Sequence, residues 1–426
     1  MWLKMKIADK VTLTGKHERR DRLFAAGLGA AWFVMMCYAA WYRVRPWPDI
    51  LLHIDFSSFW MAASLLKEGA GGRMFDPGVQ YSFELNLRHQ LATTDFIRTD
   101  TGFNPYPNLP SLALLYLPLT FLPIPVAYVI WWVISFASFV AGIALPLRHR
   151  KYGRSLAVLM LSFVAVTTSM FEGQPYGLFL LSFSLSLLAL RSGRGFLGGL
   201  LLGLFWLKPQ YAVLFPVVFL LKRRWRELAG TLVSGAFVAI LSVALVGIDG
   251  VIGFLRLLQD IGGFSYPWVD PWAMVNWRSL LMNLWPSISD EAGSVLVLVL
   301  GAATVLAALF VWRGRWDASS PRFARQMIVT VLAVTLASPH SHIHGAAFLL
   351  PPLALSLPAV DDAVPAGKVW TALLALGYAL SLAIWPGGAA RWILVPYFLV
   401  AMAMLIHQLQ TDSPSTAEEK LQAALP

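Results

Sequence analysis

Long apolar runs separated by short polar turns dominate the chain. A transmembrane helix needs about 20 apolar residues, and several runs reach that length. The pattern predicts an all-α polytopic membrane protein with about 12 transmembrane helices. The predicted crossings are residues 23–42, 126–147, 156–170, 178–190, 196–207, 211–221, 228–246, 292–311, 327–337, 346–360, 369–385 and 392–406.

Two long stretches between these runs contain no span. The first, residues 43–123, holds two short amphipathic segments at 58–67 and 81–91, too short to cross a bilayer and suited to its interface. We expect Ser58 to cap the first of them. Residues 109–122 are apolar but short and rich in proline, so we expect an interfacial or re-entrant helix there. The second stretch is residues 247–290.

Several predicted crossings are shorter than a bilayer requires. The segments between residues 156 and 221 contain only about 12–16 apolar residues each, against the ~20 needed to span. Their tips should therefore lie below the lipid headgroups and surround a wet cavity. Irregular backbone at that depth is tolerated only against protein or water.

The charge pattern sets the orientation of these elements. The chain is 58% hydrophobic and only 13% charged, with a formal net charge of +10. The basic residues lie in short loops between apolar runs, which is typical of cytoplasmic membrane loops rather than of a nucleic-acid-binding surface. We expect residues 1–22 and the polar tail 409–426 to be cytoplasmic, the tail disordered, and residues 23–42 to be an uncleaved signal anchor. The single cysteine, Cys37, permits no intrachain disulfide.

With this topology the polar motifs gather on the non-cytoplasmic face. Asp55 follows the first predicted span in the sequence HIDFSS. It is either a helix cap or a general base that takes a proton from an acceptor hydroxyl. Polar groups at membrane depth are candidates for function by default.

Lys208 lies in a Lys-Pro turn between two short predicted helices. It is either a snorkelling lysine or a fixed cation that binds a phosphate. His340, His342 and His344 have a spacing that permits a metal site, but no Asp, Glu or Cys is near in sequence, so hydrogen bonding to phosphate or sugar is the preferred interpretation. Gln174 and Asn276 suit sugar hydroxyls, or are polar turn residues.

The order of these motifs resembles glycosyltransferase family 87, the polyprenol-phosphate-mannose-dependent mannosyltransferases of the GT-C superfamily. The sequence departs from the family pattern at Asn108, Tyr176, His342 and Gly345. The elements that carry the resemblance are Asp55, the FNPYP sequence at 103–107, Gly173-Gln174, Lys208-Pro209, NWRSL at 276–280 and SPHSHIH at 338–344.

The resemblance implies a GT-C-type domain over residues 23–408 that transfers a hexose with inversion. The donor would be a polyprenyl-phosphate-linked sugar, and the acceptor a lipid or glycan. Neither a cofactor nor a metal is expected, and no nucleic-acid partner. Asp55 would be the general base. The implied phosphate ligands are Lys208, His344 and Arg278, and the implied sugar or acceptor ligands are Asn104, Tyr106, Gln174, Gln210, Asn276, His340 and His342.

The implied location is the plasma (inner) membrane, with the active site on the non-cytoplasmic face. A transporter or flippase of a lipid-linked sugar is the alternative from another class. Such a protein typically has inverted repeats and polar groups near the midplane of the membrane. The polar groups of this chain instead favour one face.

Overall fold

A computed structural model describes residues 54–90, 105–150, 152–265, 271–357 and 391–411, with isolated residues between 19 and 34. Every regular element within these ranges is a helix, so the predicted all-α class is confirmed. The only pairing of strand type among them is an isolated bridge between Met274 and His342. The predicted spans at 23–42 and 369–385 lie outside the ranges in which elements are described.

Four helices in the described part of the chain are long and apolar enough to cross a membrane. A fifth crossing is formed if α7 (Gly153–Leu161) and α8 (Val164–Phe171), which are bent by 52°, count as one span. The count of about twelve crossings stays a prediction. The four long elements are α6 (Ile124–Leu147), α13 (Trp225–Gly262), α15 (Asp290–Phe310), and η5 (Arg391–Ile393) continued by α19 (Leu394–Thr411).

The remaining apolar runs form short helices. Polar turns interrupt them, and proline begins several of them because it lacks the N–H that the first turn of a helix leaves unpaired. These elements are α9 (Tyr176–Arg191), α10 (Gly195–Leu202), η3 (Gly203–Leu207), α11 (Pro209–Ala212), α12 (Leu214–Leu221), α14 (Trp277–Leu284), α16 (Pro321–Ala337), η4 (Ile343–Leu349) and α17 (Leu350–Ser356).

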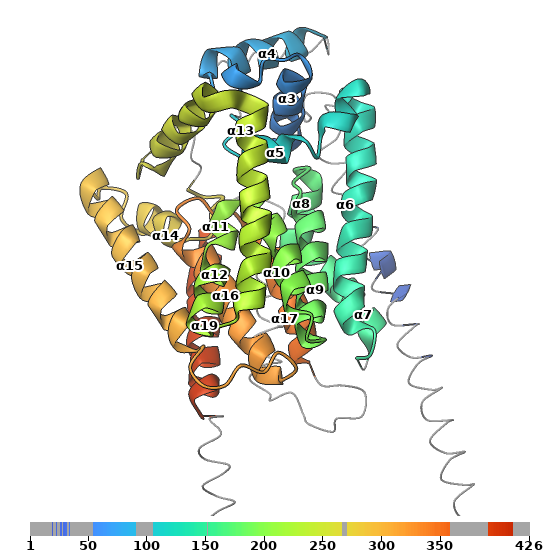
Figure 1. The fold of residues 1–426 in the computed structure, drawn as a ribbon, viewed down its shortest axis with the longest axis vertical. Helices are drawn as coiled ribbons and strands as arrows, with labels where there is room; N and C mark the ends of the chain where they lie inside the picture. Colours follow the sequence, from blue (N-terminus) through green and yellow to red (C-terminus); the bar gives the residue numbers. More distant parts are fainter. Residues whose placement is uncertain are drawn as a thin grey trace, which may run out of the picture.

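The first long loop forms a cap of short helices above the bundle, at the top of Figure 1. It contains α3 (Asp55–Lys67), η1 (Gly71–Arg73), α4 (Pro77–Gln90), α5 (Pro110–Ala113) and η2 (Leu117–Phe121). The expected single helix over 109–122 is broken into α5 and η2, because Pro118 cannot continue the hydrogen-bond ladder of α5. The expected serine cap is wrong, since α3 begins at Asp55 and its N-cap residue is Ile54.

Helix α13 extends further than its apolar run predicts. The expected second outer loop begins at residue 247, but the helix continues to Gly262. Gly247 bends it, with φ of 66° and ψ of −176°. At its end, the Arg278 guanidinium donates hydrogen bonds to the carbonyl oxygens of Ile261, Gly263 and Phe264. The end of α13 is thereby fixed to the start of α14.

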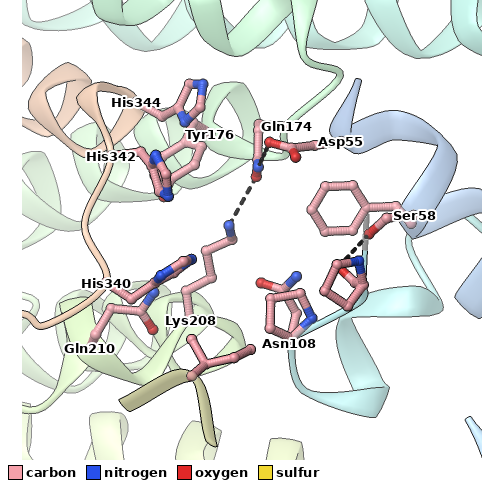
Figure 2. A pocket seen from close by; sticks show the side chains of 14 residues that line it. Asp55, Ser58, Asn108, Gln174, Tyr176, Lys208, Gln210, His340, His342 and His344 are labelled. Atoms are coloured by element: carbon pink, nitrogen blue, oxygen red, sulfur yellow. Dashed lines mark hydrogen bonds between the residues drawn. The ribbon is translucent and has the colours of Figure 1, made fainter. Parts of the chain in front are cut away.

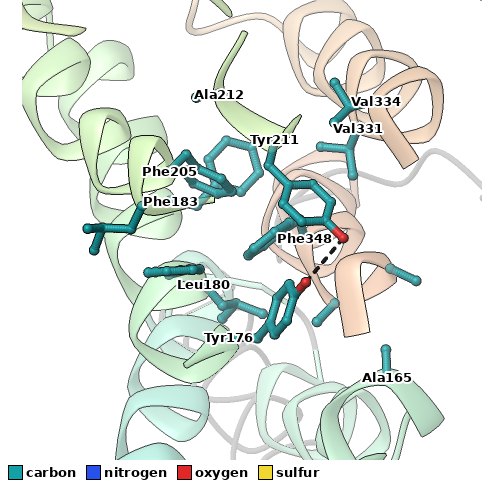
Figure 3. Packing of buried hydrophobic residues seen from close by; sticks show 14 of the residues in the cluster. Ala165, Tyr176, Leu180, Phe183, Phe205, Tyr211, Ala212, Val331, Val334 and Phe348 are labelled. Carbon is teal, nitrogen blue, oxygen red and sulfur yellow. Dashed lines mark hydrogen bonds between the residues drawn. The ribbon is translucent and has the colours of Figure 1, made fainter. Parts of the chain in front are cut away.

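Buried aromatic side chains fill the centre of the bundle (Figure 3). Phe205 of η3 and Phe348 of η4 make an edge contact with ring centroids 4.5 Å apart. Tyr176 and Tyr211 are both buried, and the Tyr176 hydroxyl donates to the Tyr211 hydroxyl at 3.2 Å. Their hydrogen bond satisfies polar atoms that would otherwise cost free energy in an apolar core. The cluster holds together segments far apart in sequence.

The basic loops come together at the end of the bundle that holds α7, opposite the α3–α4 cap (Figure 1). Lys222 donates to the carbonyl of Gly314, so the loops after α12 and α15 touch. Arg322 donates to the carbonyl of Leu409 at 2.6 Å, which joins the start of α16 to the end of α19. Loops predicted to share one membrane face are therefore adjacent in space.

Helices α10 and α13 pack with their backbones in close contact. A Cβ atom added at Gly199 would collide with the backbone carbonyl of Glu227. At Gly301 of α15 the nearest atom to an added Cβ, the carbonyl oxygen of Ala337, lies 3.5 Å away, which is ordinary contact. Small residues allow membrane helices to approach in this way.

This difference gives a matched stability test. Gly199→Ala should destabilise the protein by about 1–3 kcal/mol, as is usual when a packed core is overfilled. Gly301→Ala should leave stability nearly unchanged, because its methyl group finds space. Thermal unfolding of both purified variants in detergent measures the difference. Equal melting temperatures would contradict the close packing of α10 on α13.

Candidate functional site

A cavity of about 180 Å³ lies between the helical cap and the turns of the later short helices. Figure 2 shows polar side chains converging on it from both sides. Its lining residues are Asp55, Ser58, Phe59, Pro105, Pro107, Asn108, Gln174, Tyr176, Lys208, Gln210, Ile261, His340, His342 and His344.

Asp55 occupies the first turn of α3 and faces this cavity. Its carboxylate accepts a hydrogen bond from Nε2 of Gln174. Asp55 does not serve as the N-cap of α3, because Ile54 holds that position and no side chain caps it. The helix dipole still favours a negative charge in a first turn. The arrangement therefore favours the interpretation of Asp55 as a functional carboxylate over a capping role.

Lys208 approaches from the opposite wall. It lies in the turn between η3 and α11, is 6% exposed, and donates from Nζ to Oε1 of Gln174 at 2.9 Å. Its Nζ also lies 4.8 Å from the ring centroid of Tyr176 and 5.7 Å from that of Phe59. Burial lowers the pKa of Lys208 to about 8, while the nearby Asp55 charge raises it. The lysine is thus a fixed cation at neutral pH, suited to an anionic group.

His340 and His342 lie on the loop between α16 and η4, and His344 lies in the first turn of η4. That loop is held against the start of α14 by the Met274–His342 bridge and by a hydrogen bond of 2.9 Å from Val275 N to Ser341 O. Burial lowers the pKa of His340 to about 3 and that of His342 to about 4. Both are therefore neutral and act as hydrogen-bonding groups.

Two ring nitrogens of these histidines remain open to a ligand. His340 Nδ1 and His344 Nε2 are buried and have no hydrogen-bond partner within the described ranges. Buried polar atoms normally find partners, so each exception calls for an explanation. Among the described residues no group of three or more His, Cys, Asp or Glu side chains is arranged to hold a metal ion. The geometry favours hydrogen bonding to a polar ligand.

Three of the residues singled out from the sequence lie beside the cavity without lining it. The Arg278 guanidinium is occupied by the carbonyl oxygens at the end of α13. Asn276 caps α14, its Oδ1 accepting from Ser279 N at 2.9 Å. The Tyr106 hydroxyl donates to the Leu109 carbonyl at 2.8 Å, and its ring meets Phe59 edge-on. Asn104 lies outside the described residues.

Other lining residues were not among the predicted site residues. Ser58 lies one helical turn after Asp55, and residues three apart share a helix face. The helical spacing could have identified it. Asn108 and Tyr176 occupy positions at which the sequence departs from the family pattern, so motif matching passed over them. Their side chains nevertheless help to shape the cavity.

A second, mainly apolar cavity of about 210 Å³ adjoins the first. The two share part of their lining, including Lys208 and His340. A molecule with a charged head and an apolar chain fits this pair of spaces, with its head at Lys208. The apolar lining comes from the cap, the later turns and the end of α13: Pro107, Leu109, Leu207, Pro209, Phe254, Leu258, Ile261 and Pro339.

Comparison with known proteins identifies the family. The sequence model of glycosyltransferase family 87 matches residues 105–339, more than half of the chain, and this range includes Gln174 and Lys208. No curated protein and no solved structure matches the chain. The match agrees with the resemblance seen in the motifs and with the apolar helices of the fold. The chain therefore belongs to glycosyltransferase family 87 and is a membrane glycosyltransferase.

Proposed function

We propose that this protein transfers a hexose, with mannose as the sugar, from a polyprenyl-phosphate-linked donor to a lipid or glycan acceptor. The observation that carries the proposal is the pair of adjoining cavities with Lys208 at their junction. A polyprenyl chain suits the apolar cavity, and the phosphate to which it is linked then lies near the ammonium group. The sugar would extend into the polar cavity toward Asp55.

In this reaction Asp55 accepts the proton of the acceptor hydroxyl as its oxygen attacks the anomeric carbon. The bond from that carbon to the phosphate oxygen breaks, the configuration inverts, and polyprenyl phosphate leaves. Lys208 and the free Nε2 of His344 stabilise the charge that develops on the leaving phosphate. Gln210, His340 and His342 line the cavity where sugar hydroxyls would lie.

We place the active site on the non-cytoplasmic face of the plasma (inner) membrane. The support for this orientation is the position of the basic loops in the fold. The basic loops meet at the end opposite the helical cap, and basic loops are retained on the cytoplasmic side. The cavity between the cap and the short helices would then face outward.

The reaction is tested by replacing the proposed base. Asp55→Asn keeps nearly the same shape but cannot accept a proton, so turnover should fall at least ~10²-fold while folding and donor binding persist. The measurement is transfer of labelled sugar from purified polyprenyl phosphate sugars in membranes, resolved by thin-layer chromatography. Asp76→Asn, an exposed carboxylate on the same cap, is the control.

Near-normal transfer by purified Asp55→Asn would remove Asp55 from the mechanism. Movement of the intact lipid-linked sugar across the membrane without cleavage of its phosphate bond would favour the flippase alternative instead.

The lowered pKa of Lys208 predicts that donor binding weakens at alkaline pH. Lys208 is protonated below its pKa of about 8, so donor affinity should be full at neutral pH and weaken as pH rises through that value. The phosphodiester of the donor keeps its charge throughout. Lys208→Arg, which stays charged, should abolish this alkaline weakening, and Lys208→Ala should bind the donor poorly at every pH. The measurement is the donor KM between pH 6 and 10.

The proposed orientation is tested by cysteine labelling. In a Cys37→Ser background, Tyr81→Cys on α4 should react with a membrane-impermeant maleimide applied to intact cells. Trp225→Cys at the start of α13 should react only after permeabilisation. Both positions are exposed, at 57% and 60%. The reverse labelling pattern would invert the topology.

A further inference from the structure

Gln174 lies between the two charged groups of the site, and Figure 2 shows its amide reaching both. Nε2 donates to Oδ2 of Asp55, and Oε1 accepts from Nζ of Lys208 at 2.9 Å. An ionised carboxylate only accepts hydrogen bonds and an ammonium only donates them. Only one orientation of the Gln174 amide satisfies both partners. The two charged groups therefore hold the amide in that orientation, and the amide in turn holds the carboxylate and the ammonium in place.

The backbone that carries Gln174 is itself held in place. Gly173 has φ of +66°, and a Cβ atom there would lie 2.5 Å from Cβ of Phe56 in α3. The Tyr116 hydroxyl donates to the Gly173 carbonyl at 2.9 Å. The turn can therefore approach the start of α3 this closely only with glycine at 173.

Two further hydrogen bonds tie the same turn to its surroundings. The Phe56 amide donates to the Glu172 carbonyl at 2.8 Å, and the Tyr128 hydroxyl donates to the Phe171 carbonyl at 2.8 Å. The turn is thus joined to α3 and α6 on both sides. This fixed turn places the start of the Gln174 side chain next to Asp55, and the side chain itself is buried, at 7% exposed.

The neutral Gln174 amide between the two charged groups affects the chemistry of both Asp55 and Lys208. Opposite charges attract strongly in a medium of low polarity, and a carboxylate in direct contact with a cation becomes a weaker base. The cation of such a pair is also less available to an incoming phosphate. We propose that Gln174 is a positioning residue that keeps the Asp55 carboxylate and the Lys208 ammonium connected but separate, so that one remains basic and the other remains free to bind an anion. This inference rests on the proposed function.

Several titratable groups of the described residues lie around Asp55. Lys208, His340, Tyr116 and Tyr176 interact with it electrostatically, and Glu172 lies in the adjoining turn. His340 is neutral across the working range, because burial holds its pKa at about 3. Among these described groups, Lys208 is therefore the cation with which Asp55 would pair if the Gln174 side chain were removed.

Two substitutions at Gln174 should move the pH dependence of turnover in opposite directions. Gln174→Ala lets Lys208 approach Asp55, and because contact with a cation favours the charged form of a carboxylate, the acid limb of the kcat profile should move down by about one pH unit while the maximum rate falls. Gln174→Glu places a second carboxylate beside Asp55 and shifts that limb upward by about one unit. If Gln174 had only a structural role, both substitutions would lower the rate, but they would not shift the acid limb in opposite directions.

Gln80 is a matched control for loss of a buried amide. It is 1% exposed, and its amide is hydrogen-bonded at both ends, to the Met74 carbonyl at 2.7 Å and the Tyr106 amide at 3.0 Å. Gln80→Ala should retain the wild-type acid limb whatever its rate. Gln174→Asn, one methylene shorter, should shift the limb in the direction of Gln174→Ala by a smaller amount.

A second readout does not depend on turnover. Purified Gln174→Ala should bind polyprenyl phosphate about tenfold more weakly than wild type at pH 7, because the ammonium is held by Asp55. Folded Gln174→Ala with wild-type affinity would overturn the inference, and so would acid limbs of Gln174→Ala and Gln174→Glu that do not move in opposite directions. Failure of the wild-type protein to transfer sugar overturns the proposed function instead, so the two failures are distinct.

Discussion

The site brings a carboxylate and a buried ammonium to one cavity, between the helical cap and the turns of the apolar helices. The Lys208 ammonium is 6% exposed, so it has lost most of its hydration, and a buried charge is costly without compensating partners. The Gln174 amide hydrogen-bonds both, and the rings of Tyr176 and Phe59 lie against the lysine. The cavity stays polar because its charges are arranged around a shared neutral group.

That arrangement requires backbone to reach the same point from several directions. The short helices end in turns within the bundle instead of continuing across it, and this places Gln174, Lys208 and the histidine loop around one space. The helical cap supplies Asp55 from the opposite side. Gly173 permits the closest approach, because a side chain there would meet Phe56. The aromatic cluster of Figure 3 packs beneath the turns and links their helices.

The site also divides its chemistry between charged and neutral groups. Lys208 is cationic at neutral pH, while His340 and His342 have pKa values far below neutrality and remain uncharged. Neutral imidazoles can accept hydrogen bonds from sugar hydroxyls as well as donate them. Lys208 is the one cation among the described residues that line this cavity. The second cavity adds a mainly apolar space that also reaches Lys208.

Local patterns along the chain were enough to predict the class of fold and several residues that line the cavity. Apolar runs and basic loops predicted a helical membrane protein, and the spaced motifs named Asp55, Gln174, Lys208 and the histidines that line the cavity. These signals are local, since each depends on a short stretch of residues or on the order of motifs along the chain.

The structure shows the contacts of each side chain, which local patterns do not predict. It assigned Arg278 to the end of α13, Asn276 to a helix cap and Tyr106 to packing, and it revealed Gln174 as the bridge between two charges. It also extended α13 past Gly247 and started α3 at Asp55. Hydrogen bonds such as that of Gln174 with Asp55 join residues more than one hundred positions apart. Their geometry depends on how distant helices pack, which no short stretch of sequence specifies.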